Sequence, residues 1–421
     1  MSARISRRAV LAVAAALPLA RPALAQGRAR VVIIGGGFGG ASAARWLRRV
    51  DPAIDVTLVE RNPRFVTCPF SNLMLGGLRT MQSISFGYDQ VRAAGVTVAI
   101  DTAIAIDPTA RNVRLAGGST LPYDRLILSP GVQLNYAGIA GYSEEAAEIM
   151  PHAWQAGPQT ELLRRQLEAM PDGGLVVIAA PDNPYRCPPG PYERASMIAW
   201  YLKQAKPRSK VMILDAKDSF SKQPLFMEAW KTLYPGMVEW VSKSNSGRVT
   251  RVDAKSGKVT TDFEDLSPAV ANIIPPQRAG QIAIALGLDQ GKGFCPIDPV
   301  SFESPAQRNI HLVGDAIIAG GMPKSGFSAN SQAKACAHAV ADMLAGRAPA
   351  PATLINTCYS TAAPDYGFSI GGVYRPNDQG IFAEIPGAAG TSPLGAPRET
   401  RAAEAAYAES WYSNITADMF G

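Results

Sequence analysis

Two cysteines lie in sequence surroundings that suit chemistry better than packing. Cys68 belongs to the polar, proline-flanked loop 61–77, and Cys187 belongs to a proline-rich loop directly after the apolar run Leu175–Ala180. A cysteine thiolate is a nucleophile, so a loop cysteine is a candidate reactive group, with a structural role as the alternative. A third cysteine, Cys358, lies in a late aromatic segment, and the sequence alone does not show that it meets Cys187.

The number and spacing of the cysteines argue against two other kinds of site. The chain has five cysteines, an odd number, and none has the C-x-x-C spacing of a redox, zinc or covalent haem motif. Cys336 and His338 are two positions apart on a predicted helix, about 200° around its axis, so they cannot bind one ion. We therefore expect no metal site, a helix-core position for Cys336 and a packed position for Cys295.

A glycine-rich turn predicts the strand–turn–helix around which the cysteines are positioned. Residues 31–40 read VVIIGGGFGG, a buried parallel strand with Gly35, Gly37 and Gly40 at G-x-G-x-x-G spacing. A helix is expected from Ala41 onward. Such glycines permit a sharp turn, close approach of backbone to a pyrophosphate and packing of helix against strand. The segment therefore predicts a dinucleotide site.

Further signals favour FAD as the dinucleotide. Glu60 ends the next predicted strand, where a carboxylate can accept both hydroxyls of an adenosine ribose. Residues 309–315 (NIHLVGD) end in Gly-Asp ahead of an amphipathic helix, Ser328–Leu344, so that Asp315 would hold the ribityl chain of a flavin. The loop after Ala180 has prolines and bulky side chains where a second glycine motif would stand, so we expect no nicotinamide nucleotide.

Residues 1–25 read as an export signal rather than as part of the fold. The pair Arg7-Arg8 precedes an apolar run, Ala9–Ala20, and a small-residue cleavage site ending at Ala25, as in twin-arginine signals. The run is too short to span a bilayer, and no later run is long enough. We expect a periplasmic mature protein without a membrane span. Four arginines of this segment contribute to the net charge of +6. The positive net charge of the mature chain is therefore too small to indicate nucleic-acid binding.

The remaining segments predict an α/β protein with two dinucleotide-binding-type domains and a small C-terminal domain. The expected domains are a FAD-binding domain (28–135 and 267–345), a second Rossmann-like domain (136–266) and a C-terminal domain (346–421). Further strands are expected at 96–100, 112–115, 125–129 and 211–215, a strand–turn–strand over 248–260, and a helix over 401–420.

Seven segments resemble a known family. The chain resembles the flavoprotein subunit of flavocytochrome c sulfide dehydrogenase over nearly its whole mature length, in GGGFGG, FVTCPFSN, RCPPGPYERAS, NIHLVGDA, MPKSGFSANSQ, NTCYS and AESWYSNITADMFG. The resemblance implies a glutathione-reductase-like fold with an added C-terminal domain, FAD as cofactor and sulfide as substrate. It also implies a separate c-type cytochrome as partner, which fits the missing haem motif.

The resemblance also implies roles for individual residues. Cys68 matches the cysteine that carries FAD through a thioether. Cys187 and Cys358 match a redox-active disulfide over the flavin, and Glu193 matches the acid beside it, a surface or capping acid being the alternative. Lys324 is expected near the pyrimidine edge of the flavin or, alternatively, as an exposed loop lysine.

Two other functions are considered. A sulfide–quinone reductase shares the fold and the disulfide chemistry but would need an exposed apolar C-terminal surface, whereas this tail carries Arg398, Arg401, Glu404 and Glu409. A non-enzymatic or auxiliary flavoprotein of sulfur oxidation would dock a cytochrome without oxidising sulfide. Reduction of the flavin by added sulfide, and the choice of cytochrome or quinone as acceptor, distinguish the three.

Overall fold

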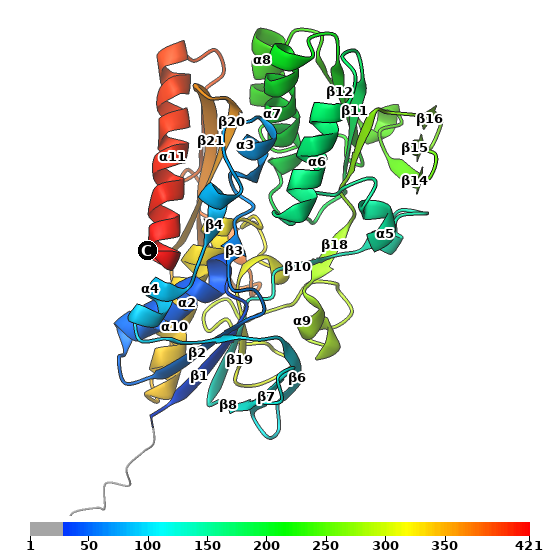
Figure 1. The fold of residues 1–421 in the computed structure, drawn as a ribbon. Helices are drawn as coiled ribbons and strands as arrows, with labels where there is room; N and C mark the ends of the chain where they lie inside the picture. The colour runs from blue at the N-terminus through cyan, green and yellow to red at the C-terminus, as the bar shows by residue number, and fades with distance from the viewer. Residues whose placement is uncertain (1–27) are drawn as a thin grey trace, which may run out of the picture.

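The structure, a computed structural model, describes residues 28–421 (Figure 1), so the predicted export signal lies outside the described residues. The first sheet is parallel. Its strands are, in spatial order, β19 (Ile310–Leu312), β9 (Arg125–Leu128), β1 (Arg30–Ile34), β2 (Asp55–Glu60) and β5 (Thr97–Ile100). Of these, β19, β9 and β1 are largely buried. Helices α2 (Phe38–Val50) and α10 (Gly326–Leu344) pack against each other and share the core of this sheet.

The helix after the glycine-rich turn begins earlier than predicted. Helix α2 starts at Phe38, so Gly40 lies within its first turn rather than before it. A side chain at Gly40 would be impossible, because its Cβ would lie 1.7 Å from the carbonyl oxygen of Gly35. The close packing of helix against turn therefore requires the third glycine, while the first two form the turn itself.

The second sheet is also parallel and has different layers on its two faces. Its strands are, in order, β13 (Val238–Val241), β12 (Lys210–Asp215), β11 (Leu175–Ala180) and β17 (Val270–Ile273). Val176 and Ile178 of β11 face the helices α6 (Pro158–Ala169), α7 (Gly190–Ala205) and α8 (Gln223–Leu233). Val177 and Ala179 face a small antiparallel sheet of β14 (Val249–Asp253), β15 (Lys258–Thr261) and β16 (Asp265–Leu266). The predicted strand–turn–strand is thus confirmed.

The chain crosses between the two sheets twice. Strand β10 (Val132–Leu134) leads out of the first domain and pairs antiparallel with β18 (Gln277–Ala279), which leads back. The return of the chain to the first domain was predicted at residue 267, which is too early, because β17 pairs with β11 and completes the second sheet. The boundary therefore lies after Ile273.

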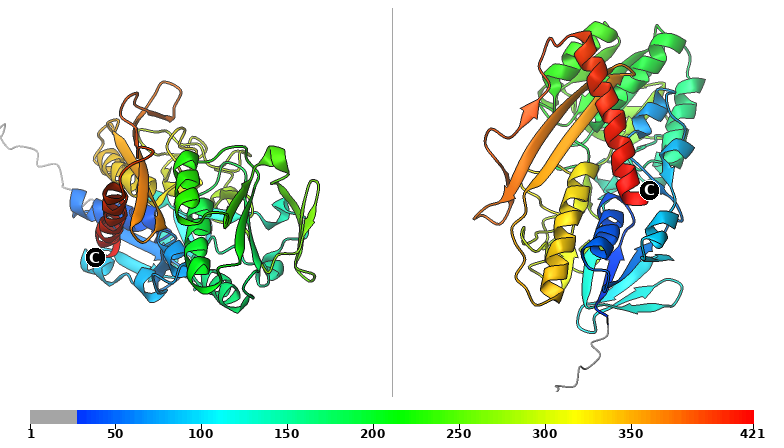
Figure 2. Two further views of the ribbon diagram at one scale, coloured as in Figure 1. Left: turned by 90° about the horizontal axis from the view of Figure 1, so that it is seen from above. Right: turned by 90° about the vertical axis from the view of Figure 1, so that its left-hand side faces the viewer.

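The C-terminal segment contains a long hairpin that the sequence analysis did not predict. Strands β20 (Leu354–Ala363) and β21 (Tyr366–Pro376) pair antiparallel and are extended by β22 (Phe382–Glu384) and β23 (Gly390–Thr391). Helix α11 (Arg398–Phe420), predicted as 401–420, runs along this hairpin and ends beside the first domain (Figure 2). Its last residues, Met419 and Phe420, join the core of the first sheet. The segment therefore binds to both other domains.

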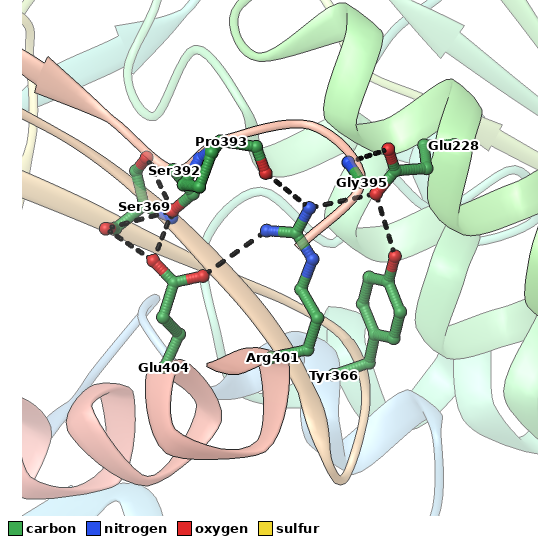
Figure 3. A network of polar contacts seen from close by, with 8 residues as sticks. All are labelled: Glu228, Tyr366, Ser369, Ser392, Pro393, Gly395, Arg401 and Glu404. Carbon is green, nitrogen blue, oxygen red and sulfur yellow. Dashed lines mark hydrogen bonds and ion pairs between the residues drawn. The ribbon is translucent and has the colours of Figure 1, made fainter. Parts of the chain in front are cut away.

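The charges predicted for an exposed tail are partly internal. Arg401 is 0 % exposed and lies among Glu228, Glu404 and Tyr366 (Figure 3). Arg398 does lie at the surface, paired with Asp365. The sequence showed the charges but not which of them the hairpin and α8 would cover.

The remaining elements are short and connect the layers. They are β3 (Phe65–Val66), α3 (Ser71–Leu75), β4 (Ser85–Phe86), α4 (Asp89–Ala93), β6 (Ala103–Asp107), β7 (Asn112–Leu115), β8 (Thr120–Pro122), α5 (Glu144–Ala147) and α9 (Gln281–Ala285). Within residues 28–421, no helix is long and apolar enough to cross a membrane, and no cluster of potential metal ligands is found.

Candidate active site

A cavity of about 1340 Å³ lies where the three parts of the chain meet. Its wall includes the carboxyl ends of strands β1 and β2, the N-terminal ends of helices α7 and α10, and the strand β20. Eight of the ten predicted site residues line it: Gly35, Gly37, Glu60, Cys68, Cys187, Glu193, Asp315 and Cys358. Gly40 and Lys324 do not line it.

The glycine turn and the Glu60 carboxylate are hydrogen-bonded to each other and both line the cavity. Gly35 has φ +99°, and its Cβ would lie 2.2 Å from the carbonyl oxygen of Ser129, so no other residue fits. The Glu60 carboxylate accepts hydrogen bonds from the backbone N–H of Gly36 at 2.7 Å and of Asn62 at 2.9 Å. Each of its oxygens keeps a second acceptor position for a ligand hydroxyl. Glu60 therefore holds the turn as well as being placed to bind a ribose.

Asp315 presents a buried oxygen that the described residues leave without a partner. Its Oδ1 has no hydrogen-bond donor there, and burial raises the pKa of the carboxyl group, an effect that Arg186 and Lys324 oppose. Buried polar atoms are ordinarily paired, so this oxygen fits a hydroxylated ligand. Together with the glycine turn and Glu60, the cavity wall suits a dinucleotide of the size of FAD.

Lys324 is directed away from the cavity. Its Nζ donates to the carbonyl oxygens of Asp315 at 3.0 Å and Ile317 at 2.5 Å and lies 3.9 Å from the centre of the Phe294 ring. Burial lowers the pKa of its ammonium group to about 8. Its backbone carbonyl accepts the N–H of Cys187 at 2.8 Å. In this structure Lys324 therefore supports the turn at Asp315 and the loop of Cys187. It is half-buried and so is not an exposed loop lysine, while its position near the flavin pyrimidine stays a prediction.

The loop that carries Cys187 is held in an unusual backbone conformation. Cys187 has φ +58°, which is uncommon for a residue with a side chain, and its carbonyl accepts the N–H of Gly190 at 2.8 Å at the start of α7. Burial raises the pKa of its thiol, and the nearby Glu193 and Cys358 raise it further. Strained backbone of this kind occurs preferentially at functional sites.

Cys358 reaches the same cavity from strand β20. Its Sγ accepts a hydrogen bond from Asn356 Nδ2 at 3.4 Å, and Asn356 is fixed by the hydroxyls of Ser325 and Ser328 at the start of α10. All five cysteines are free thiols in the structure, and the link between Cys187 and Cys358 stays a prediction. Cys336 in α10 and Cys295 are fully buried, as predicted.

Glu193 lies in the first turn of α7 and is linked to two residues that were not predicted, directly to Ser360 and through it to Lys222. Ser360 Oγ donates to Glu193 Oε1 at 2.6 Å, and Lys222 Nζ donates to that same hydroxyl and, at 2.7 Å, to the carbonyl of Cys358. Burial raises the pKa of Glu193, and Lys222 opposes this shift. Ser360 follows Cys358 by two positions and shares its strand face, a signal that could have identified it. No local signal marks Lys222.

A group of arginines surrounds Cys68. Its Sγ lies 3.7 Å from the carbonyl oxygen of Trp154, which also accepts a hydrogen bond from Arg186. Arg194 is buried, donates to the carbonyls of His152 and Ala153 at 2.9 and 2.6 Å, and has its pKa lowered to about 10 by burial. Both guanidinium groups interact electrostatically with the Cys68 thiol. Cys68 thus lies in an electropositive corner of the cavity.

The fold and the cavity define a dinucleotide-binding oxidoreductase. The family model described as pyridine nucleotide-disulphide oxidoreductase matches residues 29–170. Two further models match later parts of the chain: the central part of the sulfide dehydrogenase [flavocytochrome c] flavoprotein chain, over 160–275, and the flavocytochrome c sulphide dehydrogenase flavin-binding part, over 350–420.

Individual relatives agree with these matches. The sulfide dehydrogenase [flavocytochrome c] flavoprotein chain of Chlorobaculum thiosulfatiphilum is 67% identical over 46 residues, which is 11% of this chain and 96% of that sequence. The sulfide-quinone reductase of Aquifex aeolicus is 26% identical over 372 residues, 80% of this chain and 82% of that one. A solved structure of the sulfide:quinone oxidoreductase from Aquifex aeolicus has the same fold, with a TM-score of 0.73, 19% identity and coverage of 93% and 92%. The chain belongs to the family of flavocytochrome c sulfide dehydrogenase flavoprotein chains and is an oxidoreductase.

Proposed function

We propose that this chain oxidises sulfide with bound FAD and a disulfide formed by Cys187 and Cys358, and passes the electrons to a separate c-type cytochrome. The observation that carries the proposal is the convergence of Cys187, Cys358 and Glu193 on the cavity that also contains Asp315 and the glycine turn. We further propose export to the periplasm by the signal in residues 1–25.

The chemistry follows from the groups at the cavity wall. Hydrosulfide attacks one sulfur of the disulfide, so that one S–S bond forms as the other breaks and the second cysteine leaves as a thiolate. Glu193 takes the proton that remains on the attacking sulfur. Bound FAD would supply two-electron acceptance and one-electron release, which a haem acceptor requires.

The test is anaerobic addition of sulfide to the purified chain with its cofactor. Loss of the oxidised flavin absorbance, followed by reoxidation with cytochrome c and not with a soluble quinone, is the expected result. Reoxidation by quinone would favour a function like that of the sulfide-quinone reductase of Aquifex aeolicus. A flavin that sulfide does not reduce would favour the auxiliary, non-enzymatic function.

A covalent link between FAD and Cys68 leads to a first prediction. We expect acid-precipitated wild-type protein to keep its flavin in the pellet, whereas Cys68→Ser releases all of it, because a hydroxyl cannot form the thioether. Flavin absorbance of pellet and supernatant measures the effect. Cys295→Ser, which alters a cysteine outside the cavity lining, should leave the flavin in the pellet. Free flavin in the wild-type supernatant would contradict the link.

NADH is expected to reduce the flavin at least about 100-fold more slowly than sulfide. Asp215 ends β12 as Glu60 ends β2, but Asp215 is 0 % exposed. One of its oxygens accepts hydrogen bonds from the Nζ and the backbone N–H of Lys217 at 2.6 and 3.1 Å, and the other accepts from Tyr192 Oη at 2.6 Å and Trp240 Nε1 at 2.9 Å. The acid therefore has no free position for a ribose. Stopped-flow mixing with each donor checks this, and comparable rates would overturn it.

A further inference from the structure

Lys222 is a buried cation whose position the proposed chemistry does not yet explain. It is 6 % exposed, has φ +61° just before α8, and lies 5.7 Å from the centre of the Phe368 ring. Its two hydrogen-bond acceptors, the carbonyl of Cys358 and the hydroxyl of Ser360, are both neutral oxygens. Burying an ammonium group without a carboxylate in direct contact is costly, so a functional reason is expected.

The hydroxyl of Ser360 connects Lys222 to the cavity. A charged lysine has donors and no acceptor, so Ser360 Oγ must accept from Nζ and direct its own proton to Glu193 Oε1, 2.6 Å away. Glu193 lines the cavity, whereas Lys222 and Ser360 lie behind its wall. The three groups thus form a directed chain of hydrogen bonds from the protein interior to the substrate side.

Burial brings the pKa values of Glu193 and Lys222 closer together, and the charges around the two groups oppose that change. Burial raises the pKa of Glu193 and lowers the pKa of Lys222, while each of the two groups opposes the shift of the other. The other groups that face Lys222 are the thiols of Cys187 and Cys358 and, from α11, the carboxyl group of Glu404, which all raise its pKa. Arg194, next to Glu193 on α7, lowers the pKa of that acid.

We propose that Lys222 is a positioning residue that prepares Glu193 as the base for the substrate sulfur by fixing the hydroxyl proton of Ser360 toward Glu193 Oε1. Lys222 stays an ammonium ion: it donates to Ser360 Oγ, and Ser360 donates to the carboxylate, which is the hydrogen-bond direction that the structure has. The proton that moves is the one that Glu193 takes from the substrate sulfur, so that an S–H bond breaks, a Glu193 O–H bond forms and no electrons are transferred. This role rests on the proposed function, because it requires Glu193 as the base.

Four variants and a control test this role through the rate and pH profile of flavin reduction by sulfide. Ser360→Ala is expected to lower the rate about 10- to 100-fold, and Ser360→Thr, which keeps the hydroxyl, should restore most of it. Lys222→Met should lower the rate similarly and move the acidic limb to higher pH, because Glu193 loses the cation that lowers its pKa. Lys222→Arg, which keeps a positive charge, should keep the limb and lose less of the rate than Lys222→Met.

The control is Ser196→Ala, a buried serine of the second domain that hydrogen-bonds Tyr192 and Trp230 and takes no part in this chain of hydrogen bonds. It should change neither the rate nor the profile. Full activity in Ser360→Ala, or an unshifted acidic limb in Lys222→Met, would overturn the positioning role while leaving the proposed function intact. A wild-type flavin that sulfide does not reduce would overturn both. If the Lys222 variants do not fold, the Ser360 pair decides.

Discussion

Replacing Cys358 by serine is expected to lower the rate of sulfide-driven flavin reduction by a factor on the order of 10³ or more, the scale of losing one member of a catalytic unit. The variant should still bind FAD, and dithionite should still reduce it. The physical reason is that a hydroxyl can neither form the Cys187–Cys358 disulfide nor leave as a stable anion when hydrosulfide attacks. Stopped-flow absorbance measures the rate, and peptide mapping under non-reducing conditions should find the link in the wild type.

A purely structural disulfide makes a different prediction for the same variant. A disulfide that closes the long loop between Cys187 and Cys358 can add about 4–5 kcal/mol to the free energy of unfolding in the chain-entropy model. The Cys358→Ser protein would then melt at lower temperature, while each folded molecule kept its sulfide activity. Cys336→Ala, which changes a cysteine in the α10 core, is the control for loss of a thiol. An active Cys358→Ser protein, or a wild type without the link, would refute the disulfide mechanism.

Replacing Arg401 by methionine is expected to destabilise the protein by about 3–5 kcal/mol, the cost of removing one partner from a buried ion pair. Arg401 Nη2 donates to Glu228 Oε1 at 2.9 Å and to the carbonyl of Pro393 at 2.7 Å, and Nη1 lies 3.4 Å from Glu404 Oε2 (Figure 3). The Arg401 side chain is 1% exposed, so water cannot replace these contacts. Its loss removes the cation that pairs with two carboxylates and a donor to the carbonyl of Pro393. Denaturant unfolding followed by circular dichroism measures the change.

A neighbouring arginine on the same helix provides the matched control. Arg398 pairs with Asp365, but their side chains are 46% and 60% exposed, so Arg398→Met should cost less than about 1 kcal/mol. Equal losses for the two variants would contradict the idea that burial of Arg401 holds α11 to α8 and the hairpin.

Unfolding measured at low pH tests the direction in which the stability from the Arg401–Glu228 pair changes with pH. The pKa of Glu228 is held below its ordinary value by the backbone N–H of Gly395 and by Arg401, so the stability from that pair is present at neutral pH and lost on acidification.

The features of this protein that depend on residues adjacent in the chain could be predicted from the sequence. The strand–turn–helix at Gly35, the strands β11 and β12, and the helices α10 and α11 all follow from local patterns of glycine and apolar residues, and the structure confirms them. The fold class is confirmed as well, because alternating strands and helices leave few ways to cover a parallel sheet. Even so, the first turn of α2 was misplaced, since its residues Phe38–Gly40 look like part of the turn.

The tertiary structure decided which distant residues share the cavity and which charges are buried. The sequence named Cys187, Glu193 and Cys358 separately, but the packing of β20 beside α7 and α8 brings Ser360 and Lys222 to them. It also turns Lys324 toward backbone carbonyls and encloses Arg401, although both residues belong to segments that looked exposed. The physical reason is that backbone conformation is set mainly by local sterics and hydrogen bonds. The burial and partners of a long polar side chain depend instead on segments far away in the chain, and no local pattern records them.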